Sequence, residues 1–250
     1  MYIKKGGEKL NLLLTNDDGV NAIGVRKLAK ALSKKHNVII VAPNSNCSGF
    51  SQSLTVRKTI TFKKTVFDDG IESYTVCGTP TDCVKIAHHL LKDFKIDAVI
   101  SGINDGFNIG TDVFYSGTVA AATEGAILGY KAIAFSIPYN AEEYIDFYAQ
   151  KSADFVDELL NFDNTVWNVN FPGCNPNEIK GVKFTPVGVV EYADRYEKTG
   201  ENSYFLTGEL IRSKKNNPDC DSEHILNGFI TISPISTDKT DYKILKTVQK

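Results

Sequence analysis

Short apolar runs alternate with helical patterns through about the first 136 residues, and this alternation is the strongest constraint on the fold. Asn11–Thr15, Asn37–Ala42, Asp97–Ser101 and Lys131–Ser136 each hold a mainly apolar run of strand length. The second run, NVIIVA, is almost uniformly apolar, which is typical of a parallel strand covered on both faces. The rhythm predicts an α/β fold with a doubly wound, mostly parallel Rossmann-like sheet and right-handed crossovers.

Segments with helical periodicity lie between these strands and are predicted to form the crossover helices. Between the first two strands, Val25, Leu28 and Leu32 fall on one apolar stripe with a helical repeat. The other elements are predicted in chain order as helices at Ile23–Lys35, Thr81–Leu91, Gly117–Leu128 and Ala141–Leu160, an extended excursion at Leu54–Lys64 and Ser73–Cys77, and a strand at Val166–Phe171.

The texture of the sequence changes after Pro172. Pro172, Pro176 and Gly181 mark a linker, and short β-like runs follow it. These runs are predicted at Val182–Thr185, Tyr204–Leu206, Phe229–Ile232 and Tyr242–Leu245. We therefore expect residues 1–172 to form the Rossmann-like α/β core. Residues 173–250 are expected to form a β-rich C-terminal elaboration or arm that is not an independent domain.

Charge and apolar content exclude several classes of partner. The 250 residues include 28 basic and 30 acidic side chains, a net charge of −2, without a long block of like charge. A protein that binds duplex nucleic acid or anionic lipid usually carries a basic face, so we expect no duplex nucleic acid and no membrane as partners. The longest apolar stretches, such as Val38–Ala42, are far shorter than the ~20 residues that span a bilayer.

The N-terminal segment and the cysteines indicate a cytoplasmic protein. The first nine residues carry charge and lack the apolar segment of a secretory signal. The five cysteines are odd in number, scattered and without C-x-x-C spacing. This usage favours reduced thiols over a disulfide framework or a zinc site.

Several common catalytic motifs are missing. The chain has no Gly-Lys dipeptide for a P-loop, and Gly102, Gly106 and Gly110 are spaced by four, which breaks the dinucleotide pattern G-x-G-x-x-G. Gly102–Gly106 has the frame of a nucleophile elbow, but Asn104 stands where a serine is required. The four histidines are dispersed and are interpreted as surface or structural residues.

Three predicted strands end in loops rich in oxygen-bearing side chains. These loops contain Asn16–Gly19, Asn44–Gly49 and Gly102–Asp112. Ligands of open α/β sheets bind outside the carboxyl ends of the strands, so the loops are expected to converge there. The adjacent carboxylates Asp17 and Asp18 repel each other unless a cation lies beside them. An oxygen-only ligand set favours Mg²⁺ or Mn²⁺, although Asn16–Gly19 taken alone fits a turn before a helix equally well.

The third loop leads into a segment that fits an anion. Tyr115–Val119 opens a predicted helix of small residues, and Ser116, Gly117 and Thr118 offer hydroxyls, free backbone N–H groups and a close backbone approach. Ser116 acting simply as the helix N-cap is compatible with this interpretation. A metal site beside a phosphate cradle indicates phosphoester hydrolysis of a small substrate.

Motifs along nearly the whole chain, from about Asn11 to Ile235, resemble the SurE family of survival-protein nucleotidases. The resemblance rests on Thr15–Gly19, Ala42-Pro43 with Ser48-Gly49, Gly78–Val84, Ser101–Asn104, Tyr115–Val119 with Glu124-Gly125, Asn168–Pro172 and Gly228–Pro234. Two stretches depart from the family pattern. Asn44–Cys47 lacks the usual charged residues, which leaves the substrate preference open, and the late motif reads GFITISP.

The resemblance implies a metal-dependent nucleotidase that hydrolyses nucleoside 5′- and 3′-monophosphates to nucleoside and phosphate, with exopolyphosphatase activity in some members. It implies one divalent metal ion per subunit, Mg²⁺ or Mn²⁺, held here by Asp17, Asp18, Ser48 and Asn104. It also implies self-association as dimers or tetramers that exchange the C-terminal arm.

On this interpretation the phosphate is bound by Asn108, Ser116, Gly117 and Thr118, and Asp17 or Asp18 also moves a proton, with Asp17 favoured. Attack by an aspartate, as in a haloacid-dehalogenase-like phosphatase, is the mechanistic alternative. That class expects two aspartates separated by one residue, whereas Asp17 and Asp18 are adjacent. A non-catalytic nucleotide-binding stress-response module is the second alternative.

Overall fold

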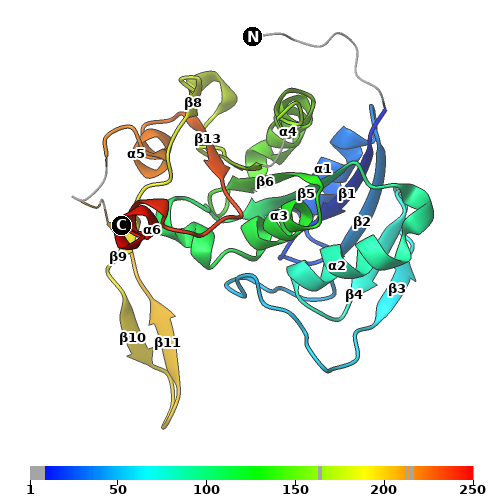
Figure 1. Cartoon of the computed structure of the whole chain (residues 1–250), viewed down its shortest axis with the longest axis horizontal. Helices are drawn as coiled ribbons and strands as arrows, with labels where there is room; N and C mark the ends of the chain where they lie inside the picture. The colour runs from blue at the N-terminus through cyan, green and yellow to red at the C-terminus, as the bar shows by residue number, and fades with distance from the viewer. Residues whose placement is uncertain (1–8, 163–164, 212, 214–216, 250) are drawn as a thin grey trace.

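A nine-stranded sheet forms the centre of the computed structural model, which describes residues 9–162, 165–211, 213 and 217–249 (Figure 1). The strands run in the order β3-β4-β2-β1-β5-β6-β7-β13-β8. Their bounds are β1 Asn11–Thr15, β2 Asn37–Pro43, β3 Phe62–Thr65, β4 Ser73–Val76, β5 Ala98–Asp105, β6 Lys131–Ile137, β7 Val166–Asn170, β8 Val182–Phe184 and β13 Ile230–Ile235.

The sheet is mostly parallel. The neighbours from β4 through β7 all pair in parallel, whereas β3 is antiparallel to β4 and β13 is antiparallel to β7. Between β1 and β5 the strand order changes direction, since β2 lies on one side of β1 and β6 lies on the far side of β5. The predicted doubly wound Rossmann-like α/β fold is therefore confirmed.

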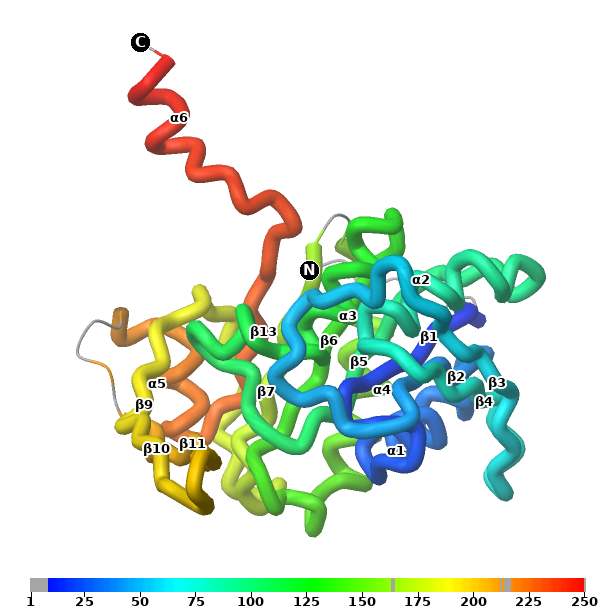
Figure 2. The backbone as a smooth tube through the Cα atoms, turned by 90° about the horizontal axis from the view of Figure 1, so that it is seen from below, coloured from blue at the N-terminus to red at the C-terminus, as the bar shows by residue number. Residues whose placement is uncertain are grey.

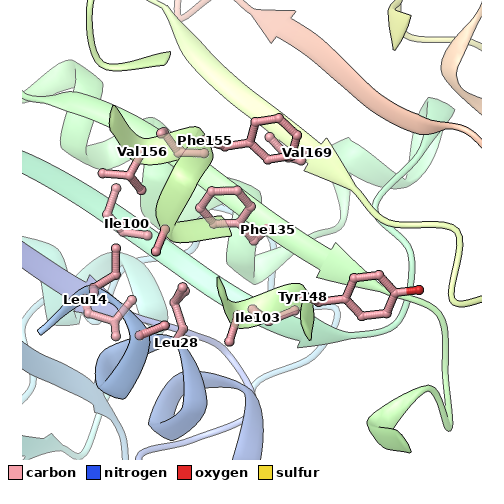
Figure 3. Packing of buried hydrophobic residues seen from close by; sticks show 14 of the residues in the cluster. Leu14, Leu28, Ile100, Ile103, Phe135, Tyr148, Phe155, Val156 and Val169 are labelled. Carbon is pink, nitrogen blue, oxygen red and sulfur yellow. The ribbon is translucent and has the colours of Figure 1, made fainter. Parts of the chain in front are cut away.

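Helices cover both faces of the sheet. The main helices are α1 Ile23–Leu32, α2 Pro80–Leu90, α3 Gly117–Ile127 and α4 Ile145–Leu159. Helices α1 and α4 pack together on one face, and α2 and α3 pack together on the other. Figure 3 shows the core beneath α1 and α4, where Leu28 and Val156 lie over Leu14, Ile100 and Phe135 of the strands.

Local sequence explains how these helices begin. Thr79 caps α2 in a capping box with Asp82, and Pro80 occupies the first helical position. Ser116 caps α3 by accepting a hydrogen bond from the Val119 N–H at 3.0 Å. The predicted helix Ala141–Leu160 is divided into a short 3₁₀ turn, η3 (Glu142–Tyr144), and α4.

The C-terminal third combines strands with two short helices. Strand β13 lies in the central sheet, between β7 and β8. Two small antiparallel sheets join β10 (Arg195–Lys198) with β11 (Tyr204–Thr207), and β9 (Glu191–Tyr192) with β12 (Leu210–Ile211). The helices are α5 (Asp221–Leu226) and α6 (Tyr242–Val248), and α6 extends away from the body of the molecule (Figure 2).

The predicted β-like run at Tyr242–Leu245 is wrong, because these residues begin α6. The Asp241 carboxylate caps this helix by accepting hydrogen bonds from the N–H groups of Lys243 and Ile244, both at 3.0 Å. A short apolar run does not by itself distinguish a strand from a helix, and here the N-cap decides. Within the described part of the chain, no helix combines the length and apolar character required to cross a membrane.

Candidate functional site

The loops that follow β1, β2 and β5 lie at the carboxyl ends of neighbouring parallel strands. The loop after β1 and the end of β5 flank the point where the strand order reverses, which is where open α/β sheets bind their ligands. Asp17 and Asp18 come from the first loop, Ser48 from the second, and Asn104 from the end of β5.

The first loop is a tight turn fixed by Asn16. The buried Asn16 side chain accepts a hydrogen bond from the Gly19 N–H at 3.2 Å and donates one to the Gly19 carbonyl at 3.0 Å. Gly19 has a φ of +107°, which favours glycine. This turn holds Asp17 and Asp18 side by side at the end of β1.

Asp17 is buried against the beginning of α3. The Thr118 hydroxyl donates a hydrogen bond to its Oδ1 atom, and a Cβ added at Gly117 would lie 2.8 Å from the Asp17 Cβ. Burial raises the pKa of Asp17, while the Thr118 hydroxyl and the backbone N–H groups of Thr118 and Gly117 oppose that rise. The first N–H groups of α3 therefore already face one anion, which belongs to the protein itself.

Asp18 is less buried and lies toward the second and third loops. Its carboxylate accepts hydrogen bonds from the Asp105 backbone N–H and from the Asn46 amide, both at 3.3 Å. Burial, followed by the charge of Asp17, raises the pKa of Asp18 to about 7. A carboxylate pair whose ionisation is opposed in this way is stabilised by a cation placed beside it.

Asn46 connects Asp18 with Ser48. Its amide donates to Asp18, while its side-chain oxygen accepts a hydrogen bond from the Ser48 N–H at 2.9 Å. Ser48 is exposed, whereas the neighbouring Cys47 is buried, with its thiol directed to the carbonyls of Ser45 and Gly78. Sequence reasoning gave Asn46 no role, although its position two residues before Ser48 suits an Asx turn.

Asn104 presents an oxygen atom at the end of β5. Its amide nitrogen donates to the Gly106 carbonyl at 2.7 Å, and no hydrogen bond to its side-chain oxygen is found among the described residues. The register between β5 and β6 shifts between Ser101 and Asn104. Pairing with β6 resumes at Asn104 and Asp105, and the Asp105 N–H donates to Asp18.

Asn108 lies in a network of buried amides at the ends of β6 and β7. Its backbone N–H donates to Asn170, its side chain donates to the Ser136 hydroxyl at 2.7 Å, and its carbonyl accepts from Asn168 and Asn170. These contacts fix the backbone that leads from β5 into η2 (Gly110–Phe114) and α3. Sequence reasoning assigned no role to Asn168 or Asn170.

The donor set around Asp17 and Asp18 fits a hard cation. No group of three or more His, Cys, Asp or Glu suited to a metal occurs in the described part of the chain. The candidate ligands are instead two carboxylates, the exposed hydroxyl of Ser48 and the side-chain oxygen of Asn104. Oxygen donors of this kind suit Mg²⁺ or Mn²⁺, and they do not match the nitrogen and sulfur ligands typical of zinc.

A cavity of about 440 Å³ opens beside the N-terminus of α3. Ser116 belongs to its lining, together with the apolar side chains of Val113, Phe114 and Val119 and the amide of Gln52. It is a mainly apolar space with a few polar groups, which is the usual composition of a small-molecule site.

The fold and the site together are those of a doubly wound α/β enzyme with an oxygen-donor site at its topological switch point. The family model described as survival protein SurE matches residues 12–194. The chain therefore belongs to the SurE family, and the resemblance noted in the sequence is confirmed.

Named relatives cover almost the whole chain. The 5′-nucleotidase SurE of Pseudothermotoga lettingae is 41% identical in an alignment of 238 residues that covers 91% of this chain and 89% of that protein. The protein of the same name from Clostridium botulinum strain Alaska E43 is 38% identical, over 96% of this chain and 99% of its own length. The crystal structure of the Sure protein from Aquifex aeolicus superposes with a TM-score of 0.80 at 34% identity, covering 95% of this chain and 98% of that one.

Proposed function

We propose that this protein is a metal-dependent 5′-nucleotidase that hydrolyses nucleoside monophosphates to nucleoside and phosphate. The observation that carries the proposal is the Asp17–Asp18 pair, held at the switch point of the sheet against the N-terminus of α3. Relatives named 5′-nucleotidase SurE, 38% and 41% identical over nearly the full length, support the activity. Nucleoside 3′-monophosphates and the ends of polyphosphate are proposed as further substrates.

One divalent ion per subunit, Mg²⁺ or Mn²⁺, would be held by Asp17, Asp18, Ser48 and Asn104. Such an ion polarises the phosphoryl oxygens and lowers the pKa of a bound water. Support for this assignment comes from the raised pKa of Asp18, which is caused by burial and by the neighbouring charge of Asp17. A cation beside the pair would favour the ionised carboxylates. The Asn104 side-chain oxygen supports it as well, because the amide nitrogen is already committed to Gly106.

The substrate phosphate is assigned to Asn108, Ser116, Gly117 and Thr118. Groups of this kind act by electrostatic stabilisation of the charge on the transferring phosphoryl group. The nucleoside is assigned to the cavity that shares Ser116 with this segment, where Phe114 supplies an aromatic ring. Asp17 is our candidate for the additional acid–base role.

We further propose that residues 173–250 mediate self-association into dimers or tetramers, as an elaboration of the core formed by residues 1–172. Two features support this. The β10–β11 hairpin exposes Tyr196, Tyr204 and Phe205, and α6 exposes a further apolar face away from the body of the molecule. Both would lose their exposed apolar surface in contact with a second copy. A cytoplasmic location is proposed as well, since the five cysteines are unpaired.

The decisive experiment measures phosphate release from AMP with Mn²⁺, with Mg²⁺ and after exhaustive chelation. We expect turnover with a divalent ion and its loss on chelation, with 3′-AMP and polyphosphate assayed in parallel. Activity that survives chelation would contradict the metal assignment. Nucleotide binding without phosphate release would favour the non-catalytic module, and a trapped aspartyl phosphate would favour the haloacid-dehalogenase-like mechanism.

A further inference from the structure

The third loop of the site rests on the C-terminal third of the chain. Residues 107–112 lead from β5 to η2, and residues from the segment 188–192 and from α5 lie against them. Ile109 is buried with Val190 and Ile225 in a small apolar cluster. The Thr111 hydroxyl donates to the Val190 carbonyl at 2.9 Å and accepts from the Val190 N–H at 3.2 Å.

Asp221 is the buried charged group in this contact. It has no exposed surface, and its carboxylate accepts three backbone hydrogen bonds. Oδ2 accepts from the Gly110 N–H at 2.9 Å, and Oδ1 accepts from the N–H groups of Gly188 at 2.8 Å and Ser222 at 2.7 Å. The Asp221 carboxylate therefore connects three backbone segments by hydrogen bonds: the third loop of the site, the segment before β9 and the start of α5.

Gly110 is where this contact reaches the site. It is the first residue of η2 and has a φ of +50°. Its backbone lies so close to the segment 188–192 that a Cβ added at Gly110 would lie 2.6 Å from Val190 Cγ2. Two residues before it, Asn108 is held by the amide network of β6 and β7. Six residues after it, Ser116 caps α3, whose Thr118 contacts Asp17.

We propose that Asp221 is a positioning residue for phosphate binding, because it fixes the Gly110 backbone and thereby the placement of Asn108 and the N-terminus of α3. The proposal rests on the nucleotidase function proposed above and adds to it a residue outside the segment 12–194 that the family model matches. The hydrogen bonds of the Asp221 carboxylate go to Gly110, Gly188 and Ser222, which are neither the proposed phosphate-binding residues nor the proposed metal ligands. Its effect is transmitted through one peptide group of the third loop.

Asp221→Asn is the informative substitution. An amide has one acceptor oxygen, and its NH₂ group cannot accept a hydrogen bond. If the asparagine oxygen keeps the hydrogen bonds from Gly188 and Ser222, its NH₂ group faces the Gly110 N–H. The hydrogen bond to the third loop is then replaced by repulsion between two donors. We expect inhibition by inorganic phosphate to weaken about tenfold, equivalent to about 1.4 kcal/mol, and kcat/KM for AMP to fall by a similar factor.

The dependence of activity on Mn²⁺ distinguishes a role of Asp221 in positioning the phosphate-binding residues from a general disruption of the site. Asp17, Asp18 and Ser48 lie on the first two loops, and the fourth proposed ligand, Asn104, lies in β5 ahead of Gly110. The Mn²⁺ concentration for half-maximal activity is therefore expected to change by less than about twofold, well below the tenfold effect on phosphate. Asp219→Asn is the matched control, because it removes a largely exposed carboxylate two residues away. A parallel, equal loss of Mn²⁺ and phosphate affinity in Asp221→Asn would overturn the proposal.

Hydrogen–deuterium exchange tests the same contact without relying on catalysis. In Asp221→Asn, amides in residues 108–116 should exchange faster than in the wild type and in Asp219→Asn. Unchanged exchange and unchanged phosphate inhibition would refute the role of Asp221. If Asp221→Asn fails to fold, Thr111→Val removes the neighbouring bonds to Val190 and should shift both readouts in the same direction. A wild type without phosphatase activity would refute the proposed function, while the exchange data would still decide the contact.

Discussion

Replacing Asp18 by asparagine should make the metal-free protein more stable at neutral and alkaline pH while weakening its binding of metal. The pKa of Asp18 is raised by burial and by Asp17, so the folded protein binds more protons at this group than the unfolded chain between about pH 4 and 7. The contribution of Asp18 to the free energy of unfolding therefore falls as the pH rises through this interval. Asparagine has the same shape and does not ionise, so it avoids this loss.

The size of the effect follows from the pKa of Asp18. A rise from 3.8 to about 7 corresponds to about 4 kcal/mol of unfavourable ionisation at about pH 8, at about 1.4 kcal/mol for each pKa unit. Asparagine forfeits part of this gain, because its single acceptor oxygen can keep only one of the hydrogen bonds from Asp105 and Asn46. That loss costs about 1–2 kcal/mol. The net stabilisation is then about 2 kcal/mol, or about 4–8 °C in melting temperature for a chain of this length.

Scanning calorimetry in excess chelator provides the assay. At about pH 8 the melting temperature of Asp18→Asn should exceed that of the wild type, and at about pH 5 the difference should largely disappear because the folded wild type is then protonated. Adding Mn²⁺ should raise the melting temperature of the wild type more than that of the variant. A variant that melts below the wild type at about pH 8 in chelator would refute the reasoning. Asp219→Asn retains Asp18 and should melt at the same temperature as the wild type at both pH values.

Three further predictions concern the site and the assembly. Raising Mn²⁺ should partly restore phosphate release in Asp18→Asn but not in Asp17→Asn, because Asp17 is our candidate for the acid–base role and an amide cannot transfer that proton at any metal concentration. Equal rescue of both variants would contradict this. Cys47→Ser should retain full activity, since the thiol faces the Ser45 and Gly78 carbonyls, and a thousandfold loss would place Cys47 in the site. Light scattering should give at least a dimer, whereas a stable, active monomer would remove the proposed role of residues 173–250.

The core of the fold was predictable because its signals are local. The strands β1, β2, β5 and β6 each carry an apolar run with turn or cap residues beside it, and parallel pairing buries both of their faces. The same patterns placed α1, α2 and α3 to within a few residues at their ends. Such elements can be predicted without information on distant contacts, because the apolar pattern within each segment indicates which of its residues are buried.

The same distinction between local signals and distant contacts applies to the candidate site. The placement of Asp17 and Asp18 side by side was predictable from a single turn, and Ser116 as the N-cap of α3 was predictable from its position next to small residues. Asn46, Asn168 and Asn170 were not given a role, because an amide side chain acts here through hydrogen bonds to residues that are far away in the sequence. Composition and spacing identify groups that bear charge, but not the neutral groups that hold them.

Asp221 shows why that difference matters for function. Asp221 is the first residue of the short helix α5 and has the appearance of an ordinary first-turn carboxylate. In the folded chain it is fully buried, and 111 positions separate it from Gly110, whose N–H it accepts at 2.9 Å. A buried carboxylate is costly unless several donors satisfy it, so a site of this kind exists only where three backbone segments meet. The Gly110 backbone is therefore held by a hydrogen bond to the C-terminal third of the chain, and the sequence around Gly110 or around Asp221 does not by itself predict that contact.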